Sequence, residues 1–505
     1  MTARDAVPGL AANPSAPADV LLRIVPSEHD WDIVTRLVWR RSLPAEVGDA
    51  LVTHPDRRVR SALAESWHAD PELRARLLDG PDSDAILVAC GPLPYRATVA
   101  PLPDRAYERL LSHERPLVRH ETVMSAHVPV HVLVPLATHE DPVFRLAACR
   151  RVWSELPDEV RAALLDDPDR RIRQTAAVHV AHEDAERTAW LVETLTDQWQ
   201  LEDVLETGLL TRELAERLMA DGRHLARLAL NPTFPADLAA RLAGHEDPQV
   251  RLAVSARPEL TEDQRAAIDW TVTPEDRLDV LKWVWRSRGD EAVLRRCAHS
   301  AHTWLRRSAA LCEELPEDCV RLLADDEDFA VRLLLAEWHP KAPPELLYDL
   351  YLHGTHRAVG MLVTRPGFPS AGLAARCADA EDPRERALAL RDPDASPSLV
   401  ERLSRDADAS VRGAAAHDPR LPVPRLIDLL DDPEVGQAAA ANPSLPVEQM
   451  RALLDRAGVP ELDRPVTPVR ARRRAALYRR RPSWVTYSAG RLPDDHRCVR
   501  GRCCD

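Results

Sequence analysis

The chain has 505 residues, with 43 prolines but only 17 glycines, and a formal net charge of −14 at pH 7. Aromatic residues make up 4% and hydrophobic residues 45% of it. This composition argues against a sheet-rich sandwich or barrel, whose strands need β-branched and aromatic residues, and also against a disordered chain. No apolar run of about 18 residues occurs, the N-terminus lacks a secretory pattern, and the nine cysteines are scattered, so we expect a cytoplasmic protein.

A unit of about 26 residues repeats along the chain. Each unit reads as a proline, a Leu/Val-rich stretch, an acidic turn such as Asp-Pro, a Val-Arg pair and then small residues. Asp-Pro and Asn-Pro place a capping side chain before a residue suited to the first helical position, and the proline also ends the preceding helix. The resulting helices are too short to be stable alone, so they must stack. The arginine of the Val-Arg pair, or the residue aligned with it, serves as the anchor of each unit, and the arginines at these positions are called Val-Arg arginines below. The clear anchors are Arg60, Arg119, Arg145, Arg173, Arg251, Arg306, Arg332, Arg386 and Arg412.

In chain order, residues 1–456 are predicted to form an all-α, right-handed α-solenoid of about 17 two-helix repeats. Several units are degenerate, and the stretch 92–117 looks like one unit with an insertion. Residues 457–505 lack the repeat pattern and are predicted to be a poorly ordered basic tail that contains Arg and Cys.

The segments EDPQVRLAVSARPELTEDQRAAI (246–268) and DDPEVGQAAAANPSLPVEQMRALL (431–454) resemble the leucine-rich repeat variant family. The resemblance implies an α-helix followed by a second short helix, often 3₁₀, in each repeat. It also implies a right-handed superhelix without strands, in the style of HEAT and armadillo arrays. The family is defined by its structure, so the resemblance implies no particular activity.

The arginine of the Val-Arg pair recurs once per unit, so stacking should place these side chains in a row. One interpretation is a basic binding face for an acidic partner. The other is a ladder, in which each arginine pairs with Asp or Glu of the neighbouring turn and caps helix carbonyls. Tryptophans near the end of the second helix are either binding hot spots or filler between repeats. The binding-face candidates are Arg60, Arg119, Arg145, Arg173, Arg251, Arg306, Arg332, Arg412, Trp67, Trp153 and Trp338.

The C-terminal tail differs chemically from the repeats. From Glu461 to Asp505 it carries 12 Arg against 5 acidic residues, whereas the rest of the chain carries 55 basic and 76 acidic residues. Three interpretations stay open: the arginines bind nucleic-acid phosphates, fold back onto the acidic repeats, or have no role. The weak metal-ligand candidates are His496, Cys498, Cys503 and Cys504, of which two adjacent cysteines suit one ion poorly.

Catalytic signatures are absent from the sequence, which contains no G-x-x-x-x-G-K-[ST], G-x-G-x-x-G, H-E-x-x-H or G-x-S-x-G. We therefore predict a non-catalytic repeat scaffold, without a cofactor, that binds a protein or peptide partner on the solenoid surface. The alternatives are a nucleic-acid-binding HEAT-like solenoid that uses the Arg-rich tail, and a metal site built from the C-terminal cysteines.

Overall fold

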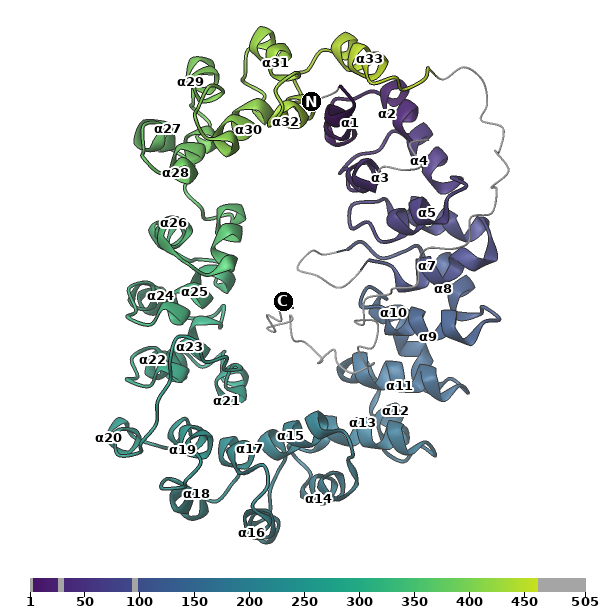
Figure 1. The fold of residues 1–505 in the computed structure, drawn as a ribbon. Coiled ribbons are helices and arrows are strands. Elements are labelled where there is room, and N and C mark those ends of the chain that lie inside the picture. Colours follow the sequence, from purple (N-terminus) through teal and green to yellow (C-terminus); the bar gives the residue numbers. More distant parts are fainter. Residues whose placement is uncertain (1–2, 26–30, 93–98, 462–505) are drawn as a thin grey trace. The chain divides into compact units, whose positions relative to one another are not determined.

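In the computed structural model, which describes residues 3–25, 31–92 and 99–461, every regular element is a helix (Figure 1). The α-helices are only four to eleven residues long. Helices of this length are not stable in isolation, so each one must bury a face against its neighbours. The predicted all-α class and helical-repeat architecture are confirmed, while the number of repeats and their handedness stay predictions.

Aspartate followed by proline begins several helices, as the sequence predicted. The side chains of Asp141 and Asp247 accept the backbone N–H groups of Val143 and Gln249 at 3.0 and 2.8 Å. The proline between donor and acceptor occupies the first helical position, where the missing N–H costs nothing.

The described residues form two compact units. The first unit consists of the described residues of Met1–Leu136 together with those from Ser370 to Glu461, and the second of Ala137–Pro369. The N-terminal part of the first unit contains α1 (Ala3–Ala12), α2 (Ala18–Ile24), α3 (Trp31–Val38), α4 (Ala45–Val52), α5 (Arg57–Ala64), α6 (Pro71–Ala75), η1 (Arg76–Asp79), η2 (Asp82–Asp84), α7 (Ala85–Cys90), α8 (Asp104–Leu111), α9 (Pro116–Met124), α10 (Val130–Leu133) and, running into the second unit, η3 (Val134–Thr138).

The second unit stacks its helices in two rows (Figure 1). The row on its concave side consists of α11 (Pro142–Arg151), α13 (Arg170–Val180), α15 (Gln198–Thr207), α17 (Leu225–Leu230), α19 (Pro248–Ser255), α21 (Lys282–Arg286), α23 (Thr303–Ala310) and α25 (Phe329–Trp338). The convex row consists of α12 (Asp158–Leu165), α14 (Ala185–Thr194), α16 (Arg212–Asp221), α18 (Ala236–Leu242), α20 (Glu262–Ala266), α22 (Glu291–Ala298), α24 (Glu317–Ala324) and α26 (Pro344–His353). Two 3₁₀ elements complete the unit, η4 (Trp153–Glu155) and η5 (Arg357–Thr364).

The first unit ends with helices from the far end of the sequence. They are α27 (Leu373–Cys377), α28 (Pro383–Leu388), η6 (Ala389–Arg391), α29 (Pro397–Leu403), α30 (Ala409–His417), α31 (Val423–Leu429), α32 (Gly436–Ala440) and α33 (Val447–Arg456). Helix α1 packs directly against α32 and α33 (Figure 1), so the two ends of the described chain lie side by side within this unit.

The core runs between the two rows. Small and branched residues of the concave-row helices meet leucines of the convex row, as in the cluster of Ala177, Ala181, Leu191 and Val204, all at most 1% exposed. Alanine lets the short helices approach closely, and the apolar area buried between rows supplies the driving force that single helices lack.

Two stretches depart from the regular repeat. The predicted insertion at 92–117 falls where residues 93–98 are not described and α8 and α9 follow. Residues 267–281 contain no helix, so the concave-row helix of this unit, α21, begins only at Lys282 and is five residues long. Among the described helices, none has the length and apolar character needed to cross a bilayer. The tail from residue 462 onward lies outside the described residues, and the single repeat array over 1–456 stays a prediction.

Candidate interaction surface

The Val-Arg arginines make one recurring contact within their own repeat. Nη1 of Arg145 donates to the carbonyl oxygens of His139 and Glu140, six and five positions earlier, both at 2.8 Å. These carbonyls lie in the turn that precedes the helix, where no intrahelical partner exists. The same pair of bonds is made by Arg60, Arg119, Arg173, Arg251, Arg306, Arg386 and Arg412.

A second contact joins neighbouring repeats. Nε and Nη2 of Arg145 donate to the carboxylate of Asp167 at 2.7 and 3.0 Å, and the carbonyl of Asp167 accepts from Arg173 of its own repeat. Burial raises the pKa of the Asp167 carboxyl, but the hydrogen bonds from Arg145 and from the backbone N–H of Asp169 bring it below the ordinary value. The chain of contacts recurs in Arg386, Asp406 and Arg412. Further inter-repeat pairs are Arg60 with Asp84, Arg251 with Asp269, Arg306 with Asp326, and Arg412 with Glu434.

Arg332 departs from this pattern. Its Nε atom is buried without a hydrogen-bond partner, and no carboxylate lies within 4.0 Å of its guanidinium among the described residues. The positions that would supply the acid hold Leu352, His353 and Gly354. The ladder interpretation accounts for the contacts of the paired arginines, and a binding role for them stays a prediction.

The three candidate tryptophans lie in different environments. Trp153 is 9% exposed and stacks on His179 with ring centroids 4.9 Å apart, so it fills the layer between two repeats. Trp67 is half-buried and its ring lies 5.3 Å from that of Trp39, which is 48% exposed. Trp338 is also half-buried.

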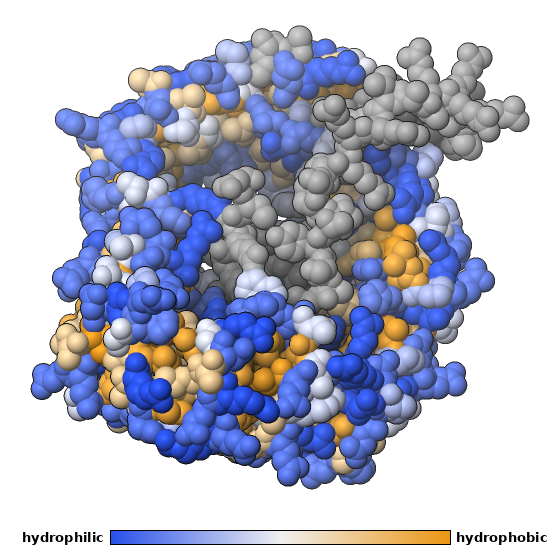
Figure 2. Space-filling view, turned by 60° about the horizontal axis from the view of Figure 1, so that its bottom comes forward, coloured by the Kyte–Doolittle hydropathy of each residue, from blue (hydrophilic) through white to orange (hydrophobic). Residues whose placement is uncertain are grey.

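Hydrophilic residues cover most of the face in Figure 2, and hydrophobic residues show between them in separate groups. Two of the large exposed hydrophobic side chains in the second unit, Val143 and Trp199, occupy equivalent positions on the concave row. Each is the second residue of its helix, and its backbone N–H donates to the capping aspartate two residues earlier, at 3.0 Å in both cases. Arg171 holds the same position on the helix between them, with its N–H 2.7 Å from the cap Asp169.

The side chain of Arg171 behaves differently from those of equivalent arginines elsewhere. Arg58, at the second position of α5, folds back onto its own cap Asp56 with an Nη2–Oδ2 distance of 2.8 Å. Arg384 does the same with its cap aspartate at 3.2 Å. For Arg171 no side-chain hydrogen bond or ion pair is present among the described residues.

Arg150 lies two turns after Val143 on α11 and is half-buried. Burial lowers the pKa of its guanidinium, the positive charge of Arg171 lowers it further, and Asp197 opposes both. Like Arg171, it makes no side-chain hydrogen bond or ion pair within the part of the chain that the structure describes. The surface formed by Val143, Arg150, Arg171 and Trp199 is here named the α11–α15 surface. It combines two exposed apolar groups with two cations that make no side-chain hydrogen bond or ion pair among the described residues.

An ionic cluster follows beyond Trp199 on the concave row. The carboxylate of Glu206, 6% exposed, lies 3.2 Å from Nζ of Lys282 and 3.4 Å from Nη1 of Arg227. Burial raises the pKa of Glu206, while the charges of Lys282 and Arg227 oppose the rise. Lys282 also pairs with Asp203, so α21 is tied to α15 although α17 and α19 lie between them in the concave row. The acids of this cluster are neutralised by its own cations, which distinguishes it from the α11–α15 surface.

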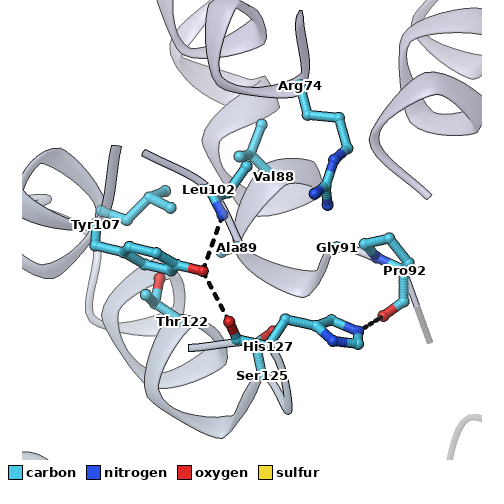
Figure 3. A pocket seen from close by; sticks show the side chains of 11 residues that line it. Arg74, Val88, Ala89, Gly91, Pro92, Leu102, Tyr107, Thr122, Ser125 and His127 are labelled. Carbon is cyan, nitrogen blue, oxygen red and sulfur yellow. Dashed lines mark hydrogen bonds between the residues drawn. The ribbon is translucent and has the colours of Figure 1, made fainter. Parts of the chain in front are cut away.

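A small cavity lies in the first unit where the repeat pattern is interrupted (Figure 3). Its volume is about 10 Å³, the space that one ordered water needs. The hydroxyl of Tyr107 bridges the N–H of Leu102 and the carbonyl of His127, and Nε2 of His127 lies 3.0 Å from the carbonyl of Pro92. Arg74 lines the cavity with a buried Nε that makes no hydrogen bond. The cavity is too small for an organic ligand.

No group of three or more His, Cys, Asp or Glu side chains in the described ranges is arranged to hold a metal ion. The candidates His496, Cys498, Cys503 and Cys504 and the tail arginines lie outside the described residues. Several histidines occupy turn positions; Nδ1 of His139, for example, accepts the N–H of Asp141 at 2.9 Å.

Sequence reasoning missed the α11–α15 surface, although a signal for it exists. Val143, Arg171 and Trp199 follow one another at steps of 28 residues, each two positions after a capping aspartate. Because the aspartate cap fixes where each helix begins, it also fixes where the side chain of the second helical residue lies.

The fold and these contacts define the class of protein, an α-helical repeat array. No known protein family and no curated protein matches the sequence. Among solved structures, the chain is similar to one from a study of tubulin recruitment and assembly by microtubule polymerases with TOG domain arrays. That likeness has 12% identity, covers 88% of this chain and 100% of that chain, and has a TM-score of 0.19. A crystal structure of an engineered protein shows 16% identity, 88% and 99% coverage, and a TM-score of 0.14. Both TM-scores are well below the range of a shared fold.

Proposed function

We propose that the chain is a non-catalytic repeat scaffold that binds an acidic segment of a protein partner on the α11–α15 surface. The observation that carries the proposal is that half-buried Arg150 and exposed Arg171 make no side-chain hydrogen bond or ion pair among the described residues and lie on one surface with exposed Trp199 and Val143. Arginine and tryptophan are the residues most enriched in binding hot spots.

The chemistry of the partner follows from the arrangement of these groups. A carboxylate placed between Arg150 and Arg171 would relieve their mutual repulsion and make charge-assisted hydrogen bonds. An aromatic or aliphatic side chain next to it would cover Trp199 or Val143. Because Arg150 and Arg171 are the cations of this surface, the acidic residue of the partner belongs next to them.

The Val-Arg arginines and Trp153 then serve the array itself rather than the partner, since their polar and ring contacts are made within the repeats. We also propose membership of the leucine-rich repeat variant family, supported by the Asp-Pro and Val-Arg units of about 26 residues. Nucleic-acid binding through the Arg-rich tail is the alternative function.

The test is selection of random twelve-residue peptides displayed on phage against the immobilised full-length chain. We expect enrichment of peptides that contain Asp or Glu next to an aromatic or aliphatic residue. Synthetic versions of the selected peptides are then titrated against the wild type, Arg150→Ala and Arg171→Ala. Each substitution should weaken binding about tenfold, as expected for a hot-spot arginine.

Arg58→Ala is the matched control, because it removes an arginine at the equivalent helical position that is already paired with its cap. Its affinity for the same peptides should equal that of the wild type. Absence of enrichment over the bare matrix would refute the proposal, as would peptides that bind Arg150→Ala and Arg171→Ala as tightly as the wild type.

A further inference from the structure

The first repeat of the chain is held to the last repeat by the same hydrogen bonds that join successive repeats elsewhere. Nδ2 of Asn442 donates to two carbonyl oxygens of the preceding repeat, those of Ala416 at 2.8 Å and Asp418 at 2.7 Å. Nδ2 of Asn13 donates to the carbonyls of Ala440 and Asn442 at 2.9 and 2.7 Å. Asn442 follows its acceptor Ala416 by 26 positions, so Asn13 takes the place that the asparagine of one further repeat, 26 positions after Ala440, would take.

The turns that contain Asn13 and Asn442 are alike in their other hydrogen bonds as well. The Oδ1 atoms of Asn13 and Asn442 accept the N–H groups of Ser15 and Ser444 at 2.9 and 2.8 Å, and both asparagines are fully buried. Asn231 makes the corresponding bonds in the second unit, to the carbonyls of the repeat before it.

Helix packing at the junction is as close as the backbone allows. A Cβ atom added at Gly9 of α1 would lie 2.1 Å from the carbonyl oxygen of Gln437 and 2.8 Å from Cβ of Ala440 on α32. The obstacle is largely backbone, so only glycine fits at this position. Two ion pairs also join the two ends of the chain, one from Arg23 to Asp455 at 2.7 Å and one from Arg451 to Asp19 at 2.9 Å.

We propose that this junction is also a binding site for a second copy of the chain, in which the first repeat of one copy stacks on the last repeat of another. The contacts of the junction come from the last repeat and from the N-terminal helices α1, α2 and α3, since Arg36 and Asp32 of α3 also hydrogen-bond to Gln437. The interface therefore cannot distinguish its own first repeat from that of another copy, which is the condition for exchange of identical elements between protomers.

Chain concentration decides between the two arrangements. Within one chain the end repeats meet at an effective concentration that is typically about 1 mM for a well-matched link. Closed monomers therefore dominate at low concentration, and head-to-tail pairs appear as the chain concentration approaches that value. An opened chain would expose the apolar face of α32, including Ala439 and Ala440, which are fully buried, so the open form favours a second copy over solvent.

The experiment uses the full chain with either of two C-terminal affinity tags. The two versions are mixed at about 10 μM and at about 1 mM in a low urea concentration that opens the junction, then diluted and captured through one tag. Hydrogen exchange of the α32 amides, measured at 10 μM, reports the closed form. The decisive variant is Gly9→Ala, which favours the α1 helix itself but obstructs its contact with α32. Gly413→Ala is the matched control, because the added Cβ would lie 3.8 Å from the side chain of Val435.

We expect protected α32 amides at 10 μM and co-capture of the second tag only from the 1 mM mixture, in the wild type and in Gly413→Ala alike. Gly9→Ala should lose both the protection and the co-capture. The proposal is overturned if the 1 mM mixture gives no co-capture, if co-capture survives Gly9→Ala, or if the α32 amides exchange equally fast in the wild type and Gly9→Ala.

Discussion

The buried histidine at the start of α23 makes the second unit sensitive to acid. Nδ1 of His302 accepts the N–H of Trp304 at 3.2 Å, so the ring proton sits on Nε2 and is donated to Oγ of Ser255 at 2.9 Å. The Ser255 hydroxyl in turn donates to the carbonyl of Leu252, and the ring of Trp270 stacks on the imidazole at 4.0 Å. The neutral ring has all its hydrogen bonds, whereas a second proton would break the cap.

The size of the effect follows from the pKa. Burial lowers the pKa of His302 to about 3, and the charges of Arg265 and Arg306 contribute to the shift. The unfolded chain, with an ordinary histidine pKa of about 6.5, binds the proton more readily, so the contribution to stability is complete above pH 6.5 and is lost as the pH falls towards 3. The loss amounts to about 2 kcal/mol at pH 5 and about 5 kcal/mol below pH 3.

The test is His302→Asn, because asparagine keeps a good N-cap without a titrating group. Hydrogen exchange of the α23 amides at pH 7 and pH 5, corrected for intrinsic rates, gives the opening free energy at each pH. We expect it to fall between the two pH values by about 2 kcal/mol more in the wild type than in His302→Asn. His356→Asn is the control, since His356 caps η5 through the same Nδ1 bond but is exposed.

The reasoning is refuted if His302→Asn loses as much stability between pH 7 and pH 5 as the wild type does. It is equally refuted if His356→Asn removes the pH dependence of α23. The variant retains His179 and His339, whose pKa values burial also lowers, so only the difference between the two proteins measures His302.

The arginine ladder, the Glu206 cluster and the buried thiols each give a further prediction. Arg386→Ala deprives the carboxylate of Asp406 of its guanidinium and should lower the free energy of unfolding by about 1–3 kcal/mol in urea titrations, against less than about 0.5 kcal/mol for the exposed Arg384→Ala. Lys282→Met removes one of the cations that pair with buried Glu206, so hydrogen exchange of the α15 amides should become at least tenfold faster, about 1.4 kcal/mol in opening free energy. The control Lys341→Met should leave the exchange of α15 unchanged. Equal exchange rates of α15 in Lys282→Met and the wild type would contradict the prediction. The buried thiols should resist iodoacetamide in the native chain, as mass spectrometry can show, and rapid labelling would contradict their burial. They are Cys149, Cys297, Cys312, Cys319 and Cys377, of which burial raises the pKa of Cys297 and Cys312 to about 12.

Much of the local structure was predictable because the residues at the start of each helix are specific to that position. An aspartate cap, a proline at the first position and an arginine four residues later fix the turn, the helix start and the ladder contact together. The exceptions have local causes as well. One turn has His139 at the position where other repeats have an acid. Its Nδ1 still accepts the N–H of Asp141, but it offers no carboxylate to Arg119 of the preceding repeat.

The helix-free stretch at 267–281 and the ion pair between Lys282 and Asp203 were not predictable in this way. An anchor position could be assigned to Asp279 by spacing alone, yet this residue lies in a stretch without a helix. Spacing records where a unit belongs in the array, whereas a helix also needs a face that its neighbours can bury. The ion pair between Lys282 and Asp203 joins residues 79 positions apart, so it depends on how the repeats stack and not on the local sequence.

The junction between the chain ends was predictable from the sequence in part. Asn13-Pro14 repeats the motif of Asn231-Pro232 and Asn442-Pro443, in which the asparagine side chain is buried and donates to the preceding repeat. A terminal repeat of a linear array needs a polar outer face instead, and a buried asparagine amide without acceptors costs about 1–3 kcal/mol. The motif in the first repeat therefore indicates that another repeat packs against this face and supplies the acceptors for Asn13. The sequence cannot say which one, because the acceptors lie more than 400 residues away, on Ala440 and Asn442.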